Sequence, residues 1–273
     1  MNSKLVFLAA SCGLLALSPS RADAQTQTRR GFEVGAEVLD YSYRERFEGE
    51  TVASDDGRFY GLAASFVAGL GGGYLFRTRL STDFGSVDYS SDDGEIENVR
   101  QSIGQLELQV ARDFPLSHGA TVTPFIGLGS RILGDNSGGK ETETGFLGYD
   151  RDIAYAFVPI GAAVTTQLGA SNTVTLSAQY NWVVGGDAES KFSDIDPEFP
   201  DLKMEIPGGH GLEASAMIGI PVGRTQLRVG PFMRHWNIQQ SESLTFEEDG
   251  EMIELFEPKN RTTELGVRLS LAF

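Results

Sequence analysis

Cysteine is almost absent from this chain of 273 residues, with Cys12 as the single copy. Cys12 lies inside the apolar run 5–17, which follows Lys4. The run is followed by the small-x-small sequence 22–24, so residues 1–24 are predicted to be a secretory signal peptide. The exported protein then contains no cysteine and cannot form a disulfide, even in an oxidising compartment.

A lipoprotein is the alternative for the first segment, with Cys12 as the acylated first residue. That motif usually has a leucine three residues before the cysteine, whereas Ala9 stands there. The apolar run also continues past Cys12. These two features favour the cleaved signal peptide.

Basic residues are scarce, at 22 lysines and arginines against 38 acidic residues, which gives a net charge of −16. Removal of residues 1–24 takes away Lys4, Arg21 and Asp23, so the net charge becomes −17. Nucleic-acid binding requires lysine and arginine to neutralise phosphates, and this surplus of acid argues against it.

Long hydrophobic runs are also missing. After residue 24, no apolar stretch approaches the roughly 18–20 residues that a membrane helix requires. Mean hydropathy is −0.17, a value that by itself indicates a soluble protein. A membrane-spanning strand, however, exposes only every second residue to lipid, so its hydropathy signal is much weaker than that of a helix. The 33 glycines suit tight turns and crowded barrel interiors.

What the chain does contain is strict alternation of apolar and polar or small residues. In the last segment the apolar face consists of Leu265, Val267, Leu269, Leu271 and Phe273. Period-two alternation is typical of a strand with two different faces. Nine earlier segments alternate in the same way: 32–43, 60–70, 74–87, 100–111, 121–133, 153–168, 174–182, 212–220 and 227–233. The segment 153–168 is the hardest to phase, because its opposite face carries Tyr155 and Phe157.

The connections between these segments alternate between short and long. The short ones are 69–73, 113–120, 168–172 and 221–225, and the long ones are 44–58, 88–99, 134–152, 185–209 and 239–260. This alternation is typical of bacterial outer-membrane barrels. The chain is therefore predicted to be all-β, a closed antiparallel up-and-down transmembrane β-barrel of ten strands, with eight or twelve as alternatives. Residues 25–273 are predicted to form this one barrel domain.

The final alternating segment with its terminal Phe273 resembles the C-terminal signal strand of Gram-negative outer-membrane β-barrels. In that family the barrel-assembly machinery reads this strand, which then pairs with the first strand. The resemblance implies location in the outer membrane, with short turns in the periplasm and long loops outside. It also implies contact with outer-membrane lipid and lipopolysaccharide, and leaves the oligomeric state open.

The opposite faces of the predicted strands carry six basic and six acidic side chains. Unpaired charges inside a narrow barrel are costly, so these residues are predicted to form a charge network in the lumen. A soluble sandwich would instead wet its polar face, and alternation alone does not distinguish the two. The predicted network comprises Glu33, Glu37, Arg77, Arg79, Asp83, Glu107, Arg131, Glu213, Arg228, Arg234, Glu264 and Arg268.

Aromatic residues gather near both ends of the predicted strands. Tyr60, Tyr180 and Trp182 lie toward the long loops, whereas Phe32, Tyr74, Phe76 and Phe273 lie toward the short turns. Two such girdles are expected at the interfaces of a membrane barrel. Scattered core aromatics are the simpler alternative.

Glycine and acidic motifs have simple explanations in this fold. The run 69–73 precedes a strand, so a hairpin turn is favoured over a phosphate-binding helix start. Asp-Gly pairs at 55–57, 92–94 and 248–250 indicate loop tips. The densest acidic cluster comprises Asp194, Asp196, Glu198 and Asp201. It lacks the glycine of a calcium-binding helix-loop-helix, because Phe199 stands at that position, so it is only a weak Ca²⁺ or Mg²⁺ candidate. No cofactor is predicted.

Catalytic motifs are sparse. Ten strands resemble the omptin proteases, which place an acidic pair and an Asp-x-His unit on opposite sides of the rim. The acidic pair would correspond to residues among Asp88, Asp92 and Asp93, and the histidine opposite them to His210. Gly208, however, stands where the family has aspartate. The pair His235 and Ser241 lacks a clearly placed acid, and His118 lies in a short turn.

Three classes of function follow. Small barrels are filled by side chains, so a structural or interaction barrel with acidic external loops is favoured. A narrow selective channel for ions or small solutes is the alternative, and an omptin-like rim protease is the minority hypothesis. No enzymatic activity is predicted.

Overall fold

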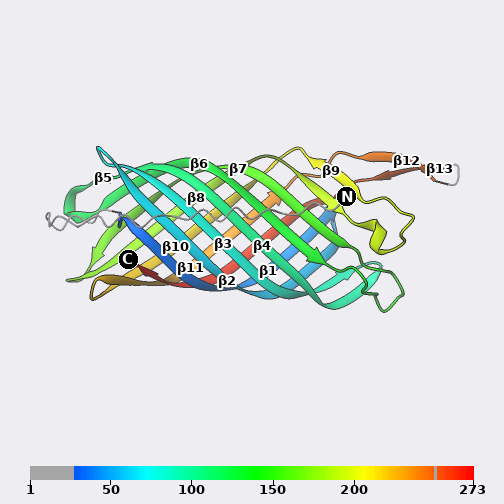
Figure 1. The fold of residues 1–273 in the computed structure, drawn as a ribbon, viewed down its shortest axis with the longest axis horizontal. Coiled ribbons are helices and arrows are strands. Elements are labelled where there is room, and N and C mark those ends of the chain that lie inside the picture. Colours follow the sequence, from blue (N-terminus) through cyan, green and yellow to red (C-terminus); the bar gives the residue numbers. More distant parts are fainter. Residues whose placement is uncertain (1–27, 249–250) are drawn as a thin grey trace.

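The computed structural model describes residues 28–248 and 251–273, so the predicted signal peptide lies outside the described residues. Ten long antiparallel strands run obliquely around one barrel, each beside the next in chain order (Figure 1). They are β1 (Gly31–Phe47), β2 (Glu50–Gly71), β3 (Tyr74–Ser91), β4 (Gly94–Arg112), β6 (Thr121–Asn136), β7 (Asp150–Leu168), β8 (Asn172–Ser190), β10 (Gly209–Val222), β11 (Thr225–Ile238) and β14 (Lys259–Ala272).

The barrel is closed by the pairing of its first and last strands. β1 pairs with β2 on one side and with β14 on the other, with Val38 opposite Val267. At the end of β14, the Phe273 amide donates to the Phe32 carbonyl at 2.8 Å. The predicted ten-strand up-and-down barrel is therefore confirmed, including the pairing of the final strand with the first.

Short elements decorate the two ends. At the short-turn end, β5 (Phe114–Pro115) pairs with β6, and η1 (Ser117–Gly119) follows it. At the long-loop end, η2 (Phe192–Asp194) precedes β9 (Leu202–Ile206), which pairs antiparallel with the last residues of β8. β12 (Leu244–Glu248) and β13 (Glu251–Leu255) form a projecting hairpin (Figure 1). In residues 28–248 and 251–273, no helix is long and apolar enough to cross a membrane.

The outer face of the barrel carries a continuous apolar belt, as the alternation predicts. Leu62 and Leu128 are each 67 % exposed, and comparable side chains point outward from every barrel strand. The segment 153–168, whose outward face is the hardest to assign from the sequence, has the predicted orientation. Tyr155 is only 4 % exposed, whereas Ile160 is 47 % exposed. Monomeric soluble proteins rarely expose contiguous apolar patches beyond a few hundred Å². An encircling belt of this kind requires a hydrocarbon environment, so the barrel is of the transmembrane type.

The belt ends before the strands do. On β1 the outward residue after Val38 is Asp40, which forms an exposed ion pair with the outward Arg58 of β2 at 2.8 Å. β1 and β2 nevertheless remain paired as far as Phe47 and Glu50. The barrel wall thus extends beyond the membrane at the long-loop end, which we call the mouth.

This extension corrects two of the predicted loops. Residues 44–58 and 88–99 are mostly strand, with two-residue turns at 48–49 and 92–93. The tip predicted at 55–57 is wrong, since these residues lie within β2, whereas the turn at 92–93 is confirmed. Backbone pairing continues beyond the membrane, where the outward residues face water instead of lipid. The apolar alternation therefore disappears although the strands remain paired. Residues 249–250 of the third predicted tip lie outside the described residues.

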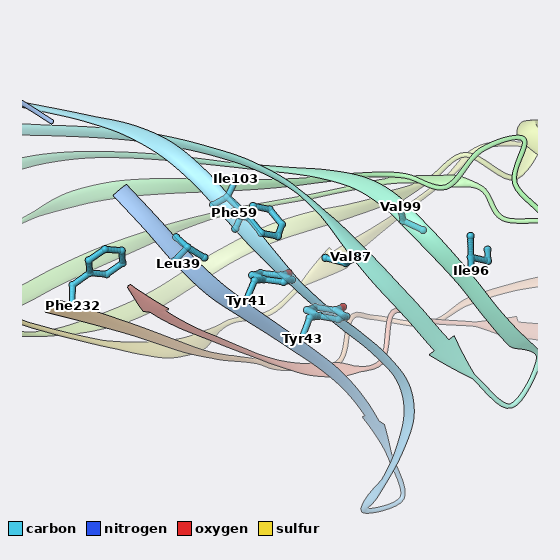
Figure 2. Packing of buried hydrophobic residues seen from close by; sticks show 9 residues of the cluster. All are labelled: Leu39, Tyr41, Tyr43, Phe59, Val87, Ile96, Val99, Ile103 and Phe232. Carbon is cyan, nitrogen blue, oxygen red and sulfur yellow. The ribbon is translucent and has the colours of Figure 1, made fainter. Parts of the chain in front are cut away.

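Buried apolar side chains gather inside the barrel on the mouth side of its charges. Tyr41 and Tyr43 from β1 belong to the first cluster, in which the Tyr41 ring lies 4.7 Å from the Phe59 ring of β2 (Figure 2). A second cluster packs around Trp236, whose ring lies 5.1 Å from the Phe157 ring. Gly129 makes room there, because a Cβ atom at that position would lie 2.3 Å from the Phe157 ring.

Candidate functional site: the charged lumen and the mouth

Arg234 on β11 is the centre of the lumen charges. Its guanidinium donates to Glu264 at 2.8 Å and to Asp83 at 3.3 Å, and it also pairs closely with Glu37. These partners come from β14, β3 and β1. One arginine therefore joins strands on different sides of the barrel through charge-assisted hydrogen bonds, which are stronger than neutral ones.

Arg131 on β6 makes a connection across the full width of the barrel. It pairs with Glu264 on β14, and both side chains are completely buried. β6 and β14 are five strands apart in either direction around the ten-stranded ring, so the pair spans the lumen. Arg131 also donates to Gln105 at 3.1 Å and lies over the Trp236 ring at 5.2 Å.

A second bridge runs from β3 and β4 to β10. Arg79 lies 3.2 Å from Glu107 and 3.4 Å from Glu213. Gln105 donates to the same two carboxylates, at 2.9 and 2.8 Å. Gln179 donates to Glu107 at 3.2 Å, which ties β8 into the same layer.

The charges closest to the short turns are also paired, with one exception. Arg228 contacts Glu33 at 2.6 Å, and Arg268 contacts Glu37 at 2.6 Å. Arg77 instead lies over the Phe125 ring at 5.1 Å, and no ion pair is found for it in the part of the chain that the structure describes. The structure thus brings eleven of the twelve predicted lumen residues into ion pairs.

The mouth holds a second charged cluster that sequence reasoning missed. Arg151 on β7 pairs with Glu45 on β1 and, at 3.0 Å, with Glu257 before β14. The Tyr43 hydroxyl donates to the same two carboxylates, at 3.1 and 3.3 Å. Most of these residues fall in or beside segments predicted as loops, where charged residues indicate only solvated surface.

Asp55 on β2 adjoins this cluster. Gln101 on β4 donates through Nε2 to Asp55 at 3.0 Å and to Asp135 on β6 at 2.8 Å. Asp55 lies beyond the apolar belt, and burial raises its pKa to about 7. Burial likewise raises the pKa of Glu257 to about 7, an effect that Arg151 opposes and Glu45 reinforces.

The acidic residues proposed as weak metal ligands do not converge. Asp194 accepts from the Asp150 amide at 2.9 Å, and Asp201 accepts from the Ser193 hydroxyl at 2.7 Å. Asp196 accepts from the amide of Glu198 at 2.9 Å. Asp196 and Asp201 therefore stabilise their own loop, whereas Asp194 ties that loop to the start of β7. Over residues 28–248 and 251–273, no group of three or more histidine, cysteine or acidic residues is arranged to hold a metal ion.

The histidines are dispersed. His210 stacks on Tyr180, with ring centroids 6.2 Å apart, and Tyr180 belongs to the exposed outer face. His235 contacts the Thr263 hydroxyl at 2.9 Å. Ser241 is buried, and its hydroxyl donates to the Glu242 carbonyl and accepts from the Glu257 amide. His118 lies in η1. Asp88, Asp92 and Asp93 lie at the hairpin between β3 and β4, where Asp88 accepts from the Asn98 amide at 3.1 Å.

The proposed assembly strand and girdles lie on the outer face. Leu265, Val267, Leu269, Leu271 and Phe273 are all exposed. So are the mouth-side aromatics Tyr60, Tyr180 and Trp182, and on the short-turn side Phe32 and Tyr74, while Phe76 is half-buried. The outer face therefore carries aromatic residues at both margins of the belt.

Comparison with known proteins identifies the fold. No protein-family model and no curated protein sequence matches the chain. The structure of the outer membrane protease OmpT from Escherichia coli is similar, with a TM-score of 0.53, 9 % identity, and coverage of 89 % of this chain and 96 % of that chain. The translocator domain of the autotransporter NalP from Neisseria meningitidis gives a TM-score of 0.40 and 11 % identity, covering 89 % and 90 %. At these identities the likeness to OmpT shows the fold, that of a closed outer-membrane-type barrel.

Proposed function

We propose that the protein is an outer-membrane barrel with a sealed lumen, which anchors an extended acidic mouth for interactions outside the cell. The observation that carries this proposal is the ion pair of Arg131 with Glu264 across the barrel, together with the four-residue group around Arg234. Buried ion pairs are strongly destabilised when one partner is lost, so side chains held in this way do not move aside readily for a solute.

The proposal also includes a cellular location and a set of partners. The transmembrane belt, the predicted signal peptide and the C-terminal strand support export to the outer membrane, with residues 25–273 as the barrel domain. The proposed partners are outer-membrane lipid and lipopolysaccharide, and the barrel-assembly machinery during insertion. The proposed role is not enzymatic, because His210 stacks on an outward-facing tyrosine rather than on a carboxylate.

Conductance in planar bilayers tests the sealed lumen. The wild-type barrel is expected to show no steady open level, whereas Arg131→Ala combined with Glu264→Ala removes the transverse pair and should produce openings. Leu128→Ala on the lipid-facing side of the same strand is the matched control and should stay closed. A steady open level in the wild type, with ion selectivity changed by Arg77→Gln, would favour the narrow channel instead.

Peptide cleavage tests the enzymatic hypothesis separately. Wild-type barrel and His210→Ala are incubated with a peptide library in the presence of lipopolysaccharide. The proposal expects no cleavage by either. Cleavage by the wild type that His210→Ala abolishes would establish a rim protease and overturn the non-enzymatic role.

A further inference from the structure

The carboxylates of Asp55 and Asp135 lie close together at the mouth, on the inner side of the barrel wall. Asp55 and Asp135 both accept from the same nitrogen of Gln101, at 3.0 and 2.8 Å. The three residues come from β2, β4 and β6, and each occupies an inward position of its strand. The curvature of the barrel therefore brings these three polar side chains together. They lie at the mouth and are not part of the lumen charge network described above.

One oxygen of this group has no partner. Asp55 is only 2 % exposed, and its Oδ1 atom accepts no hydrogen bond in the structure. A buried carboxylate oxygen without a partner is costly, and most such atoms in folded proteins are satisfied by protein or by an occupant. Asp55 and Asp135 line a cavity of about 20 Å³, together with Tyr41, Tyr43 and Arg151. A cavity of this volume holds about one water molecule or one ion of similar size.

The charges around the cavity favour a cation over a neutral occupant. The cavity is lined by the carboxylates of Asp55 and Asp135 and by the guanidinium of Arg151. Two further carboxylates, those of Glu45 and Glu257, pair with Arg151 beside the cavity. Arg151 is already shared between Glu45 and Glu257, so the carboxylates of Asp55 and Asp135 are bridged only by the neutral amide of Gln101. Asp135 also accepts from the Ser137 hydroxyl, which is neutral as well. Apart from the Arg151 guanidinium, the polar side chains that line the cavity are carboxylates, an amide and tyrosine hydroxyls, whose oxygen atoms suit hard cations such as Ca²⁺.

Going beyond the proposed function, we propose that the cavity between Asp55 and Asp135 binds one Ca²⁺-class cation at the mouth of the barrel. Asp55 supplies its free oxygen, Asp135 supplies its carboxylate, and rotation of the Gln101 amide would turn an oxygen toward the ion. Water supplies the remaining ligands through the side of half-buried Asp135. With two carboxylates, the affinity belongs to the weak extracellular class, with a dissociation constant of about 10⁻⁴–10⁻³ M. The ion would join three strands at the mouth.

Terbium luminescence provides the test, because Tyr41 and Tyr43 line the cavity and can sensitise a bound Tb³⁺ ion. Refolded full-length barrel in detergent is titrated with Tb³⁺, and bound Tb³⁺ is then displaced with Ca²⁺. The wild type should show saturable sensitised emission that Ca²⁺ removes. Asp55→Asn should weaken Tb³⁺ binding by about tenfold or more, because it removes one of the two charged ligands and even the loss of a group that only supports a ligand costs about 10–100-fold. Gln101→Glu, which adds a third carboxylate, should strengthen binding.

Controls separate this cavity from the acidic surface. Folding of every variant is checked by its heat-modifiable migration on a gel, so that loss of emission is read only from folded barrels. The double variant Asp194→Asn, Asp196→Asn removes exposed charge elsewhere at the mouth and should bind Tb³⁺ as the wild type does. Absence of Ca²⁺-displaceable emission in the wild type, equal binding by folded Asp55→Asn, or loss of binding in the double variant would each overturn the proposal.

Discussion

Arg131 and Glu264 form a solvent-inaccessible ion pair although they belong to opposite walls of the barrel. Glu264 also accepts from Arg234, so a single carboxylate holds two buried guanidinium groups. Loss of this one charge would leave two cations short of a partner. The pair therefore connects opposite walls of the barrel directly, whereas backbone pairing connects only neighbouring strands.

Glu264→Gln is expected to destabilise the barrel strongly while keeping the shape of the side chain. Breaking a buried ion pair by removal of one partner costs about 3–5 kcal/mol, because the remaining charge is left uncompensated. The temperature at which heat-modifiable migration is lost should fall accordingly. Leu265→Ala, on the lipid-facing side of the next position, is the control and should cause a smaller change. An unchanged transition for Glu264→Gln would contradict the inferred importance of the pair.

Replacement of both partners should cost less than replacement of one. Arg131→Met with Glu264→Leu substitutes an apolar contact for the ion pair, and such exchanges are often neutral or stabilising. Arg234 still loses one of its carboxylates, so some loss is expected. A double-mutant cycle on unfolding in urea measures the coupling, which for contacting residues is about 0.5–3 kcal/mol. Strictly additive effects would show that the two residues do not interact.

Gly129→Ala should destabilise the barrel because the added methyl group would collide with Phe157. Overpacking of a filled interior costs about 1–3 kcal/mol. Gly104→Ala is the matched control, since nothing lies within 4 Å of a Cβ atom at that strand position. Urea unfolding of both variants makes the comparison. Equal stability of the two variants would mean that the Phe157 ring has free space to move.

The mouth should become less stable as the pH rises toward neutrality. Burial raises the pKa of Glu257 to about 7 from its ordinary value of 4.5, so between these values the folded protein holds a proton that the unfolded chain releases. The stabilising contribution is fully present below pH 4.5 and is lost as the pH rises through 7. Transition temperatures at pH 5 and pH 8 should differ less in Glu257→Gln than in the wild type. Glu198→Gln, at an exposed position, should retain the wild-type difference.

Some features of the molecule could be read directly from the sequence. Period-two alternation fixes which side chains face outward, since a strand places successive residues on opposite faces. That rule located all ten barrel strands and resolved even the segment with Tyr155 and Phe157. It also assigned Arg131 and Glu264 to the inner face without showing that they meet.

Other features depended on tertiary structure alone. The extension of β1 and β2 beyond the membrane carries no apolar pattern, because its outward residues, such as Arg44, face water rather than lipid. Asp55 therefore resembled a loop residue in the sequence, although ladder pairing buries it beside Gln101. Which inward charges pair is decided by barrel closure, which brings residues more than 100 positions apart into contact. Local alternation sets the face of each residue, whereas the curvature of the closed sheet sets its partners.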